Sequence, residues 1–248
     1  MIGKERRLKR LFIGDRQRCL LSPLDHASWL GPVKGIHDPR QIISQVTAGG
    51  ANALLIGPGF FRQTANLVPS STAVVLRLSL TPGLASDTSQ ETPIAGIRSA
   101  LCMDADAVAV SVFFGRSGDV AIYRWLGELI EAAQSYDMPV VAEMMPPEKK
   151  SFDAEAIAHA ARIGVELGAD VIKTNYCGEV EAFRQITAMI RTPIIVAGGP
   201  KGAGDDDTLA MVRGAMEAGA AGVAIGRRVW QAADPRAVTA EMAKIIFG

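Results

Sequence analysis

Eight short runs of β-branched and other apolar residues recur along the 248-residue chain, and this repeat constrains the fold most strongly. They span residues 19–25, 51–57, 73–79, 106–114, 138–145, 170–175, 193–199 and 221–226. The clearest helical patterns cover residues 119–136, 153–167, 179–190, 206–218 and 235–246. Nearly continuous apolar runs are typical of parallel strands that helices cover on both faces. Eight β–α units in about 250 residues therefore predict an α/β fold, the closed (β/α)8 TIM barrel.

An open, doubly wound parallel sheet is the alternative fold. It would require a glycine fingerprint of the G-x-G-x-x-G type after the first strand, and the stretch "SPLDHAS" has none. No linker or low-complexity tract interrupts the sequence, so we expect one barrel domain over residues 1–248. The most loop-like segment, residues 81–93, follows the third strand, and in a barrel it would lie over the catalytic mouth.

The sequence has 26 basic and 26 acidic residues, so the protein carries no strong net electrostatic field. We therefore expect no nucleic-acid or membrane partner. The three cysteines show no close pairing, no apolar run reaches membrane-spanning length, and the start of the sequence lacks a signal-peptide core. These features favour a cytoplasmic protein. The basic cluster at residues 4–10 predicts the water-facing side of a short helix, with Leu8, Leu11 and Phe12 on its other side.

Polar or glycine-rich groups stand at the carboxyl ends of five predicted strands. They are Asp25 and His26, then Glu143 near Met145, the run from Lys173 to Tyr176, the run from Gly198 to Lys201, and Gly226 with Arg227. Active sites of such barrels form where the carboxyl ends of the strands meet. The sequence therefore predicts that these five groups surround one site.

Lys173 stands near the end of an apolar strand, where an unpaired ammonium is costly to bury. Desolvation and neighbouring cations would favour the neutral amine, which could then attack a carbonyl and form a Schiff base. The alternative is a structural ion pair that fills the barrel, and the residues alone leave the two roles about even. Arg77 is a second buried-looking cation, which we expect to bind an anionic substrate or to disfavour a positive charge on the lysine.

Other residues at this end have chemical and structural alternatives. Asp25 is the natural proton acceptor opposite the lysine, or a helix or turn cap. His26 binds substrate or caps the loop. Gly198, Gly199 and Gly226, with Lys201 or Arg227, predict a phosphate cradle, although ordinary glycine-rich turns would look the same. No H-x-H, C-x-x-C or carboxylate cluster indicates a metal, and we expect no cofactor.

Several stretches, taken together, resemble the archaeal-type class I aldolases. They are "GKERRLKRLF", "SPLDHASWLGPVKGIHDP", "VIKTNY", "IIVAGGPK" and "GVAIGRRVWQ". That family includes fructose-bisphosphate aldolases, 2-amino-3,7-dideoxy-D-threo-hept-6-ulosonate synthases and the thiolase of phosphorylated autoinducer-2. The similarity covers nearly the whole chain in the right order.

The resemblance implies a (β/α)8 barrel whose N-terminal segment closes the bottom. It implies that Lys173 is the Schiff-base residue and Asp25 the general base. It further implies substrate contacts by Asp25, His26, Ala27, Ser28 and Trp29, and phosphate contacts by Gly198, Gly199, Gly226 and Arg227. Members of this family often assemble as rings, so we expect a homo-oligomer, either a pentamer or a decamer.

One departure from the family pattern concerns the general acid. Relatives have Tyr-Pro-Arg-Gly after the fifth strand, whereas this chain has Met145 followed by Pro-Pro-Glu. A methionine that faces the substrate cannot transfer a proton. Glu143, two residues earlier on the same face, is expected to point inward and could reach Lys173, either in catalysis or as a buried ion pair. Tyr176 could supply a phenol, although packing of the loop is the favoured role.

The sequence thus predicts a Schiff-base aldolase or transaldolase that acts on a phosphorylated ketose or a related carbonyl compound. Two alternatives stay open. One is a thiolase- or synthase-type acyl transfer within the same family. The other is a barrel that binds a phosphorylated ligand without turnover, because the family tyrosine is absent.

Overall fold

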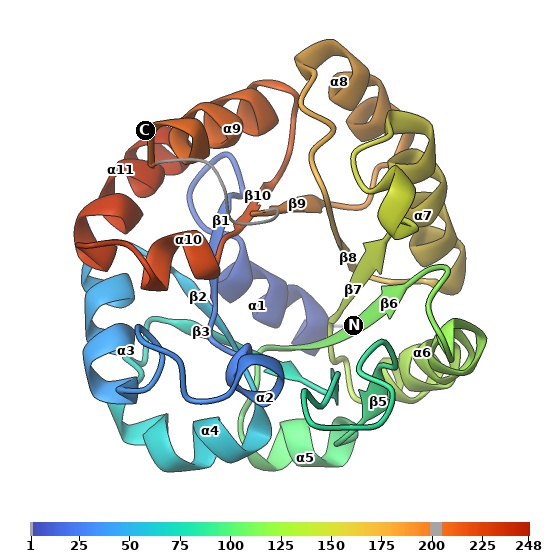
Figure 1. The fold of residues 1–248 in the computed structure, drawn as a ribbon, viewed down its shortest axis with the longest axis horizontal. Coiled ribbons are helices and arrows are strands. Elements are labelled where there is room, and N and C mark those ends of the chain that lie inside the picture. The colour runs from blue at the N-terminus through green and yellow to red at the C-terminus, as the bar shows by residue number, and fades with distance from the viewer. Residues whose placement is uncertain (1, 199–204) are drawn as a thin grey trace.

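The computed structural model describes residues 2–198 and 205–248, and eight of its strands form one closed parallel barrel (Figure 1). The barrel strands are β1 (Cys19–Pro23), β2 (Ala53–Ile56), β3 (Ala73–Arg77), β6 (Ala107–Phe113), β7 (Val140–Met145), β8 (Val171–Thr174), β9 (Ile194–Ala197) and β10 (Gly222–Ala224). They pair in this order, and β10 closes the ring against β1. The (β/α)8 prediction is confirmed. Each predicted strand extends at most two residues beyond either end of the observed strand.

Helices surround the barrel. They are α1 (Ile2–Leu11), α2 (Ala27–Leu30), α3 (Pro39–Ala48), α4 (Pro58–Thr64), α5 (Ile97–Cys102), α6 (Asp119–Gln134), α7 (Ala154–Leu167), α8 (Val180–Met189), α9 (Asp205–Glu217), α10 (Arg227–Trp230) and α11 (Pro235–Phe247), with short 3-10 turns at η1 (Ala65–Leu67) and η2 (Glu148–Lys150). Asp38, Asp153 and Asp234 cap α3, α7 and α11 through backbone N–H groups. Within the described residues, none of the helices is long and apolar enough to cross a membrane.

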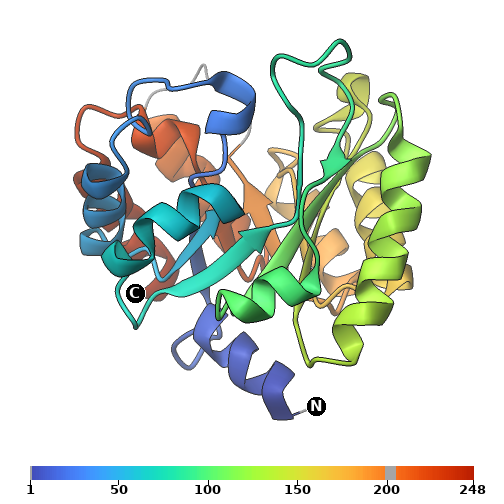
Figure 2. The same cartoon turned by 90° about the horizontal axis from the view of Figure 1, so that it is seen from below.

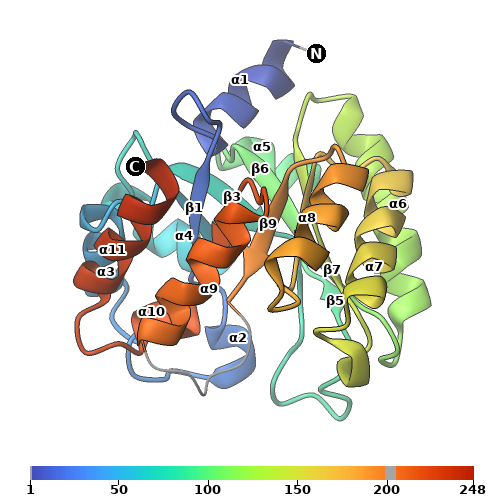
Figure 3. The same ribbon diagram turned by 90° about the horizontal axis from the view of Figure 1, so that it is seen from above.

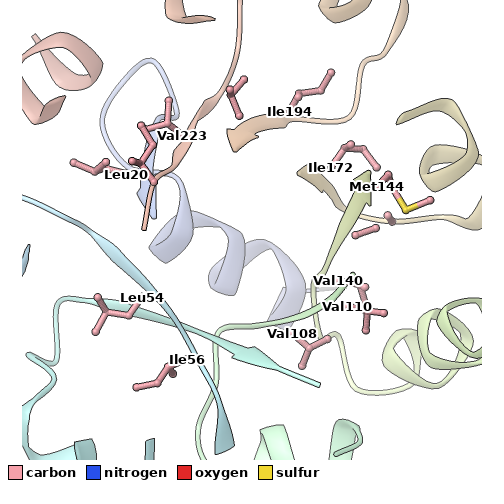
Figure 4. Packing of buried hydrophobic residues seen from close by; sticks show 14 of the residues in the cluster. Leu20, Leu54, Ile56, Val108, Val110, Val140, Met144, Ile172, Ile194 and Val223 are labelled. Atoms are coloured by element: carbon pink, nitrogen blue, oxygen red, sulfur yellow. The ribbon is translucent and has the colours of Figure 1, made fainter. Parts of the chain in front are cut away.

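Successive side chains of each barrel strand point to opposite faces, and the two sets belong to two hydrophobic cores. Side chains such as Leu54, Val110 and Ile172 point away from the barrel axis and pack beneath the helices (Figure 4). The residues between them, such as Leu55 and Ala109, point inward and fill the lower barrel. Because successive strand residues face opposite sides, the inward set continues upward into the positions that line the mouth.

Helix α1 closes one end of the barrel, as the resemblance implies. Leu11 and Phe12 are buried against the inward-facing strand side chains, with Leu8 packed beside them. Figure 2 shows α1 below the barrel, and Figure 3 shows α1 and α2 at opposite ends. The cavity of the mouth must therefore open at the other end, near α2.

The basic cluster of α1 is less water-facing than its sequence suggests. Lys4 Nζ lies 2.9 Å from Asp170 Oδ1, and Arg10 forms an ion pair with Asp106. Both aspartates stand just before the strands β8 and β6 begin, at the lower rim of the barrel. The expectation of a solvated face is thus wrong for Lys4, whose side chain is 16% exposed, whereas Arg10 stays exposed at 46% although it is paired.

The loop-like segment after β3 contains a small hairpin that the sequence does not reveal. Strands β4 (Ser79–Leu80) and β5 (Thr92–Pro93) pair antiparallel, and the loop between them lies at the end opposite α1 (Figure 2). The backbone N–H of Gly83 donates to Ser28 O at 3.1 Å. A Cβ on Gly83 would lie 2.0 Å from Trp29 O, so only glycine permits this approach. The contact ties the hairpin loop to α2 beside the mouth.

Candidate active site

An open cavity of about 1120 Å³ occupies the carboxyl-terminal mouth of the barrel. Residues at or near the carboxyl ends of β1, β3, β7, β8 and β10 line it, among them Asp25, Arg77, Glu143, Lys173 and Arg227. A smaller hollow of about 360 Å³ lies between the turn after α1 and the end of α11. That hollow is lined by Asp15, Arg16 and Arg18 but by no lysine, histidine or glutamate, so the residues predicted for the site all belong to the larger cavity or lie outside both.

Lys173 lies inside the mouth and faces a carboxylate. The parallel pairing of β7 with β8 sets Glu143 directly beside Lys173, above Val141 and Val171. Lys173 Nζ donates to Glu143 Oε1 at 2.5 Å, and both side chains line the cavity. The residue is only 6% exposed. The inward direction predicted for Glu143 is confirmed, and the lysine has both an ion-pair partner and an open cavity before it.

Arg77 connects this pair with Asp25. Its Nε lies 2.7 Å from Asp25 Oδ2, and its Nη2 lies 2.8 Å from Glu143 Oε2. Its Nη1 donates to Ser111 Oγ at 2.5 Å, and that hydroxyl in turn donates to Glu143 Oε2 at 2.6 Å. One planar guanidinium therefore holds two carboxylates from β7 and the end of β1 in a fixed geometry.

The two carboxylates paired with Arg77 are held in the ionised form. Burial raises the pKa of Glu143, but the charges of Lys173 and Arg77 outweigh burial and leave its pKa well below the ordinary value. Burial also raises the pKa of Asp25. The positive charge of Arg77, and to a smaller extent those of His26 and Lys173, outweighs burial, so the pKa of Asp25 is lowered. Neither group is a neutral acid near pH 7, so both suit a proton acceptor.

His26 completes the wall beside Asp25. Its Nδ1 lies 3.4 Å from Asp25 Oδ1, and its ring meets Trp230 edge-on with centroids 5.6 Å apart. Burial lowers the pKa of His26. The negative charge of Asp25 raises this pKa, but the positive charges of Lys173 and Arg227 lower it further, and the net shift is downward. The imidazole is therefore neutral near pH 7 and can donate or accept one hydrogen bond to a bound molecule.

The predicted phosphate side is formed by the ends of β9 and β10. Gly198, Gly226 and Arg227 all line the cavity, and the Arg227 guanidinium lies 5.8 Å from the centroid of the Trp29 ring. A Cβ on Gly226 would lie 2.8 Å from His26 Cε1, so the turn needs glycine there. Gly199 and Lys201 lie outside the described residues.

Two predicted site residues do not reach the cavity. Tyr176 is 7% exposed, and its ring packs edge-on against Phe183 of α8 with centroids 5.2 Å apart. Strand β8 delivers Asn175 to the mouth, and the next side chain points to the opposite side, under the helices. Ala27 faces the hydrophobic core. A catalytic Tyr176 and a substrate contact by Ala27 are therefore corrected, whereas Ser28 and Trp29 line the cavity.

Met145 lines the cavity one inward position above Glu143, as expected. Sequence reasoning missed other lining residues. Ser111 occupies an inward position of β6, and a polar residue within that apolar run was a usable signal. Glu91, Arg116, Lys149, Lys150 and Arg228 come from loops and helix starts, where no periodicity marks a side chain's direction. Among the described residues, no group of three or more His, Cys, Asp or Glu could hold a metal.

Comparisons with known proteins agree with this geometry. The sequence pattern of the DeoC/LacD family aldolases matches residues 19–232. A 2-amino-4,5-dihydroxy-6-oxo-7-(phosphonooxy)heptanoate synthase of Streptomyces griseus is 32% identical, over 97% of this chain and 89% of its own. A 2-amino-3,7-dideoxy-D-threo-hept-6-ulosonate synthase of Halobacterium salinarum is 35% identical, over 98% of this chain and 91% of its own.

Comparison with solved structures also finds aldolases. An archaeal fructose 1,6-bisphosphate aldolase superposes with a TM-score of 0.89 at 26% identity, and the match covers 99% of both chains. Another archaeal fructose-1,6-bisphosphate aldolase structure, with its catalytic lysine covalently bound to the carbinolamine intermediate of the substrate, also has a TM-score of 0.89 and 26% identity. That match covers 99% of this chain and 100% of the other.

Proposed function

The chain belongs to the DeoC/LacD aldolase family, and on this premise we propose that it makes or breaks a carbon–carbon bond through a Schiff base at Lys173. The donor in this proposal is a phosphorylated ketone, and the acceptor is an aldehyde. The observation that carries the proposal is the position of Lys173 Nζ, which lies in the open mouth at 2.5 Å from Glu143 Oε1.

Glu143 is the group that moves protons at the lysine. It takes the ammonium proton of Lys173 as the amine adds to the ketone carbon, and the carbinolamine forms. It then returns a proton to the carbinolamine hydroxyl, which leaves as water while the protonated imine forms. Arg77 and Ser111 hold the other carboxylate oxygen of Glu143, so the side chain keeps its direction through both steps.

Asp25 is the base for the donor carbon. Its carboxylate lines the same cavity and is kept ionised by Arg77. It removes a proton from the carbon next to the imine, and the electron pair of that C–H bond moves toward the imine nitrogen to give an enamine. The enamine carbon then attacks the aldehyde, and hydrolysis of the imine releases the product and the free lysine.

The donor phosphate is placed between the ends of β9 and β10. Gly198 and Gly226 line the cavity there, and Arg227 supplies a positive charge beside them. The curated relatives are named as synthases of seven-carbon acids. An acidic acceptor would suit the opposite rim, where Arg116, Lys149 and Lys150 line the cavity. We therefore propose an acceptor aldehyde that carries a carboxylate or a phosphate.

Replacing Asp25 with asparagine is expected to slow proton removal from the donor. In D₂O the wild-type protein should exchange hydrogen at the carbon next to the carbonyl of dihydroxyacetone phosphate, followed by NMR. The Asp25→Asn variant should exchange about 10²- to 10⁴-fold more slowly, the usual contribution of a positioned base. Borohydride should still trap the donor on the variant, because the lysine is intact.

The matched control for this experiment is Asp104→Asn. Asp104 is exposed, lies between α5 and β6, and does not line the cavity. Its variant should exchange at the wild-type rate. Wild-type exchange in Asp25→Asn would remove Asp25 from the mechanism. Product formation that occurs only with coenzyme A present would instead support acyl transfer.

A further inference from the structure

Three carboxyl groups of the cavity are partly or fully buried, and Glu91 differs from the other two. Asp25 and Glu143 are paired with Arg77. Glu91 instead accepts hydrogen bonds from two neutral hydroxyls, Ser79 Oγ at 2.6 Å and Thr81 Oγ1 at 2.7 Å. No ion pair of Glu91 is found among the described residues within the usual N···O limit. Of the three, Glu91 is thus the one without an ion pair among the described residues.

The hairpin fixes where Glu91 lies. Glu91 directly precedes β5, and Ser79 of β4 accepts a hydrogen bond from the backbone N–H of Ser111 on β6 at 3.1 Å. Glu91 is therefore tied to the wall formed by β3 and β6. In the closed strand order, β6 stands opposite β10, and β3 stands opposite β9. The proposed phosphate side and Glu91 face each other across the mouth.

This arrangement places Glu91 at the acceptor end of the substrate. A donor held by its phosphate near Gly226 and by an imine at Lys173 occupies the β8 to β10 side of the mouth. The aldehyde that joins it must approach from the remaining side, over β3 and β6. The aldehyde oxygen therefore falls on the wall that carries Glu91.

The electrostatics of Glu91 support the same assignment. Burial raises the pKa of Glu91, and the negative charge of Glu143 adds to that effect. Arg77 and the hydroxyls of Ser79 and Thr81 act in the opposite direction but do not reverse the shift. Arg116, Lys149 and Lys150 also line the cavity, and none of them forms an ion pair with Glu91 within the described residues. Opposite pKa shifts on neighbouring carboxyls are how enzymes separate an acid from a base.

We propose that Glu91 is the catalytic acid that protonates the acceptor oxygen during carbon–carbon bond formation, an inference that rests on the proposed function. As the enamine carbon bonds to the aldehyde carbon, the C=O electron pair moves to oxygen, which takes the proton of the Glu91 carboxyl. The product is a hydroxyl group and a Glu91 carboxylate, which regains a proton from water. In cleavage, the carboxylate takes the hydroxyl proton back.

Glu91 would provide the proton donor that Met145 and Tyr176 do not provide. Met145 occupies the end of β7 and has no transferable proton. Tyr176 is buried under the helices and does not line the cavity. The acceptor oxygen nevertheless needs a proton donor, because an alkoxide is a high-energy product at neutral pH. Glu91 supplies this proton from the loop after β3.

The test is the Glu91→Gln variant, whose amide keeps the shape: its oxygen can accept from one of the two hydroxyls of Ser79 and Thr81, and its NH2 group can donate to the other. We expect synthesis from dihydroxyacetone phosphate and an acidic aldehyde to slow by about 10²- to 10⁴-fold. Borohydride trapping and hydrogen exchange of the donor should stay at wild-type levels. The wild-type kcat/KM for synthesis should fall as pH rises through the raised pKa of Glu91, because the acid form is lost, and the variant should lack this limb.

Two further variants make the outcome decisive. Glu128→Gln removes an exposed carboxyl of α6 that does not line the cavity and should behave as wild type. Glu91→Asp retains a carboxyl and should keep the alkaline limb at reduced rate. Synthesis at the wild-type rate in Glu91→Gln, or loss of donor exchange together with synthesis, would overturn the inference. Failure of trapping and exchange in the wild type would instead overturn the proposed function.

Discussion

The Lys173→Met variant is expected to lose carbon–carbon bond turnover almost completely. We expect kcat/KM to fall by about 10⁴- to 10⁶-fold, as when the nucleophile of a covalent mechanism is removed. Methionine fills a similar volume, and Glu143 keeps its contacts with Arg77 and Ser111, so the barrel should still fold. Steady-state rates, with thermal unfolding as the check on folding, measure the effect.

A second substitution separates the nucleophile from the ion pair. Lys173→Arg retains a cation that can bond Glu143, but a guanidinium does not form an imine with a ketone. We expect this variant to be as inactive as Lys173→Met. Lys9→Met, an exposed position of α1 at the closed end of the barrel, should retain full activity. An active Lys173→Arg would mean that only the positive charge matters, against a Schiff base.

Replacing Arg77 with methionine is expected to have the largest effect on stability. Arg77 is 6% exposed and is bonded to Asp25, Glu143 and Ser111. Its loss leaves Asp25 buried without its main cation and Glu143 with Lys173 alone. Removing one partner of a buried ion pair typically costs about 3–5 kcal/mol of unfolding free energy. Urea unfolding at neutral pH measures the difference.

The pH dependence of stability gives an independent readout of the same network. The pKa values of Asp25 and Glu143 are lowered in the folded protein, so their stabilising contribution is complete above the unfolded carboxyl pKa, about 4. It is lost as pH falls through the folded values. In Arg77→Met the unfolding free energy should depend less on pH in the acid range, mainly because Asp25 loses the cation that lowers its pKa most.

The control for Arg77 is the same substitution in an exposed pair. Arg162 and Glu166 form an ion pair four residues apart on α7, with side chains 61% and 64% exposed. Such pairs contribute about 0–1 kcal/mol, so Arg162→Met should change the unfolding free energy little. Equal effects of the two substitutions would mean that the network of Arg77 does not stabilise the barrel.

The sequence predicted the barrel because its strands are buried on both faces and therefore read as continuous apolar runs. The short helix α1 and its apolar face, with Leu11 and Phe12, were also predictable from spacing. The hairpin β4–β5 was not, since each of its strands has two residues and no periodicity can appear in so short a segment. The ion pairs of Lys4 and Arg10 depend on the far ends of other strands.

The candidate site was predicted in part. Lys173 was identified because an ammonium in an apolar strand is costly to bury without a charged partner or a chemical role. Asp25 was identified as a carboxylate at a strand end, and Glu143 from strand periodicity two residues before Met145. Tyr176 was misplaced, because the direction of a side chain just after a strand depends on the exact strand end. Glu91 was not found, since a glutamate within a polar loop carries no sequence signal. The phosphate contacts, the homo-oligomer and the cytoplasmic location stay predictions.

Reductive trapping with peptide mapping tests the central claim most directly. The protein is incubated with dihydroxyacetone phosphate or fructose 1,6-bisphosphate, reduced with borohydride, digested and analysed by mass spectrometry. The account predicts a covalent substrate adduct on Lys173, absent without substrate and absent from Lys173→Arg. Turnover of these or other phosphorylated ketones without any adduct, or an adduct on a different lysine such as Lys149 or Lys150, would contradict it.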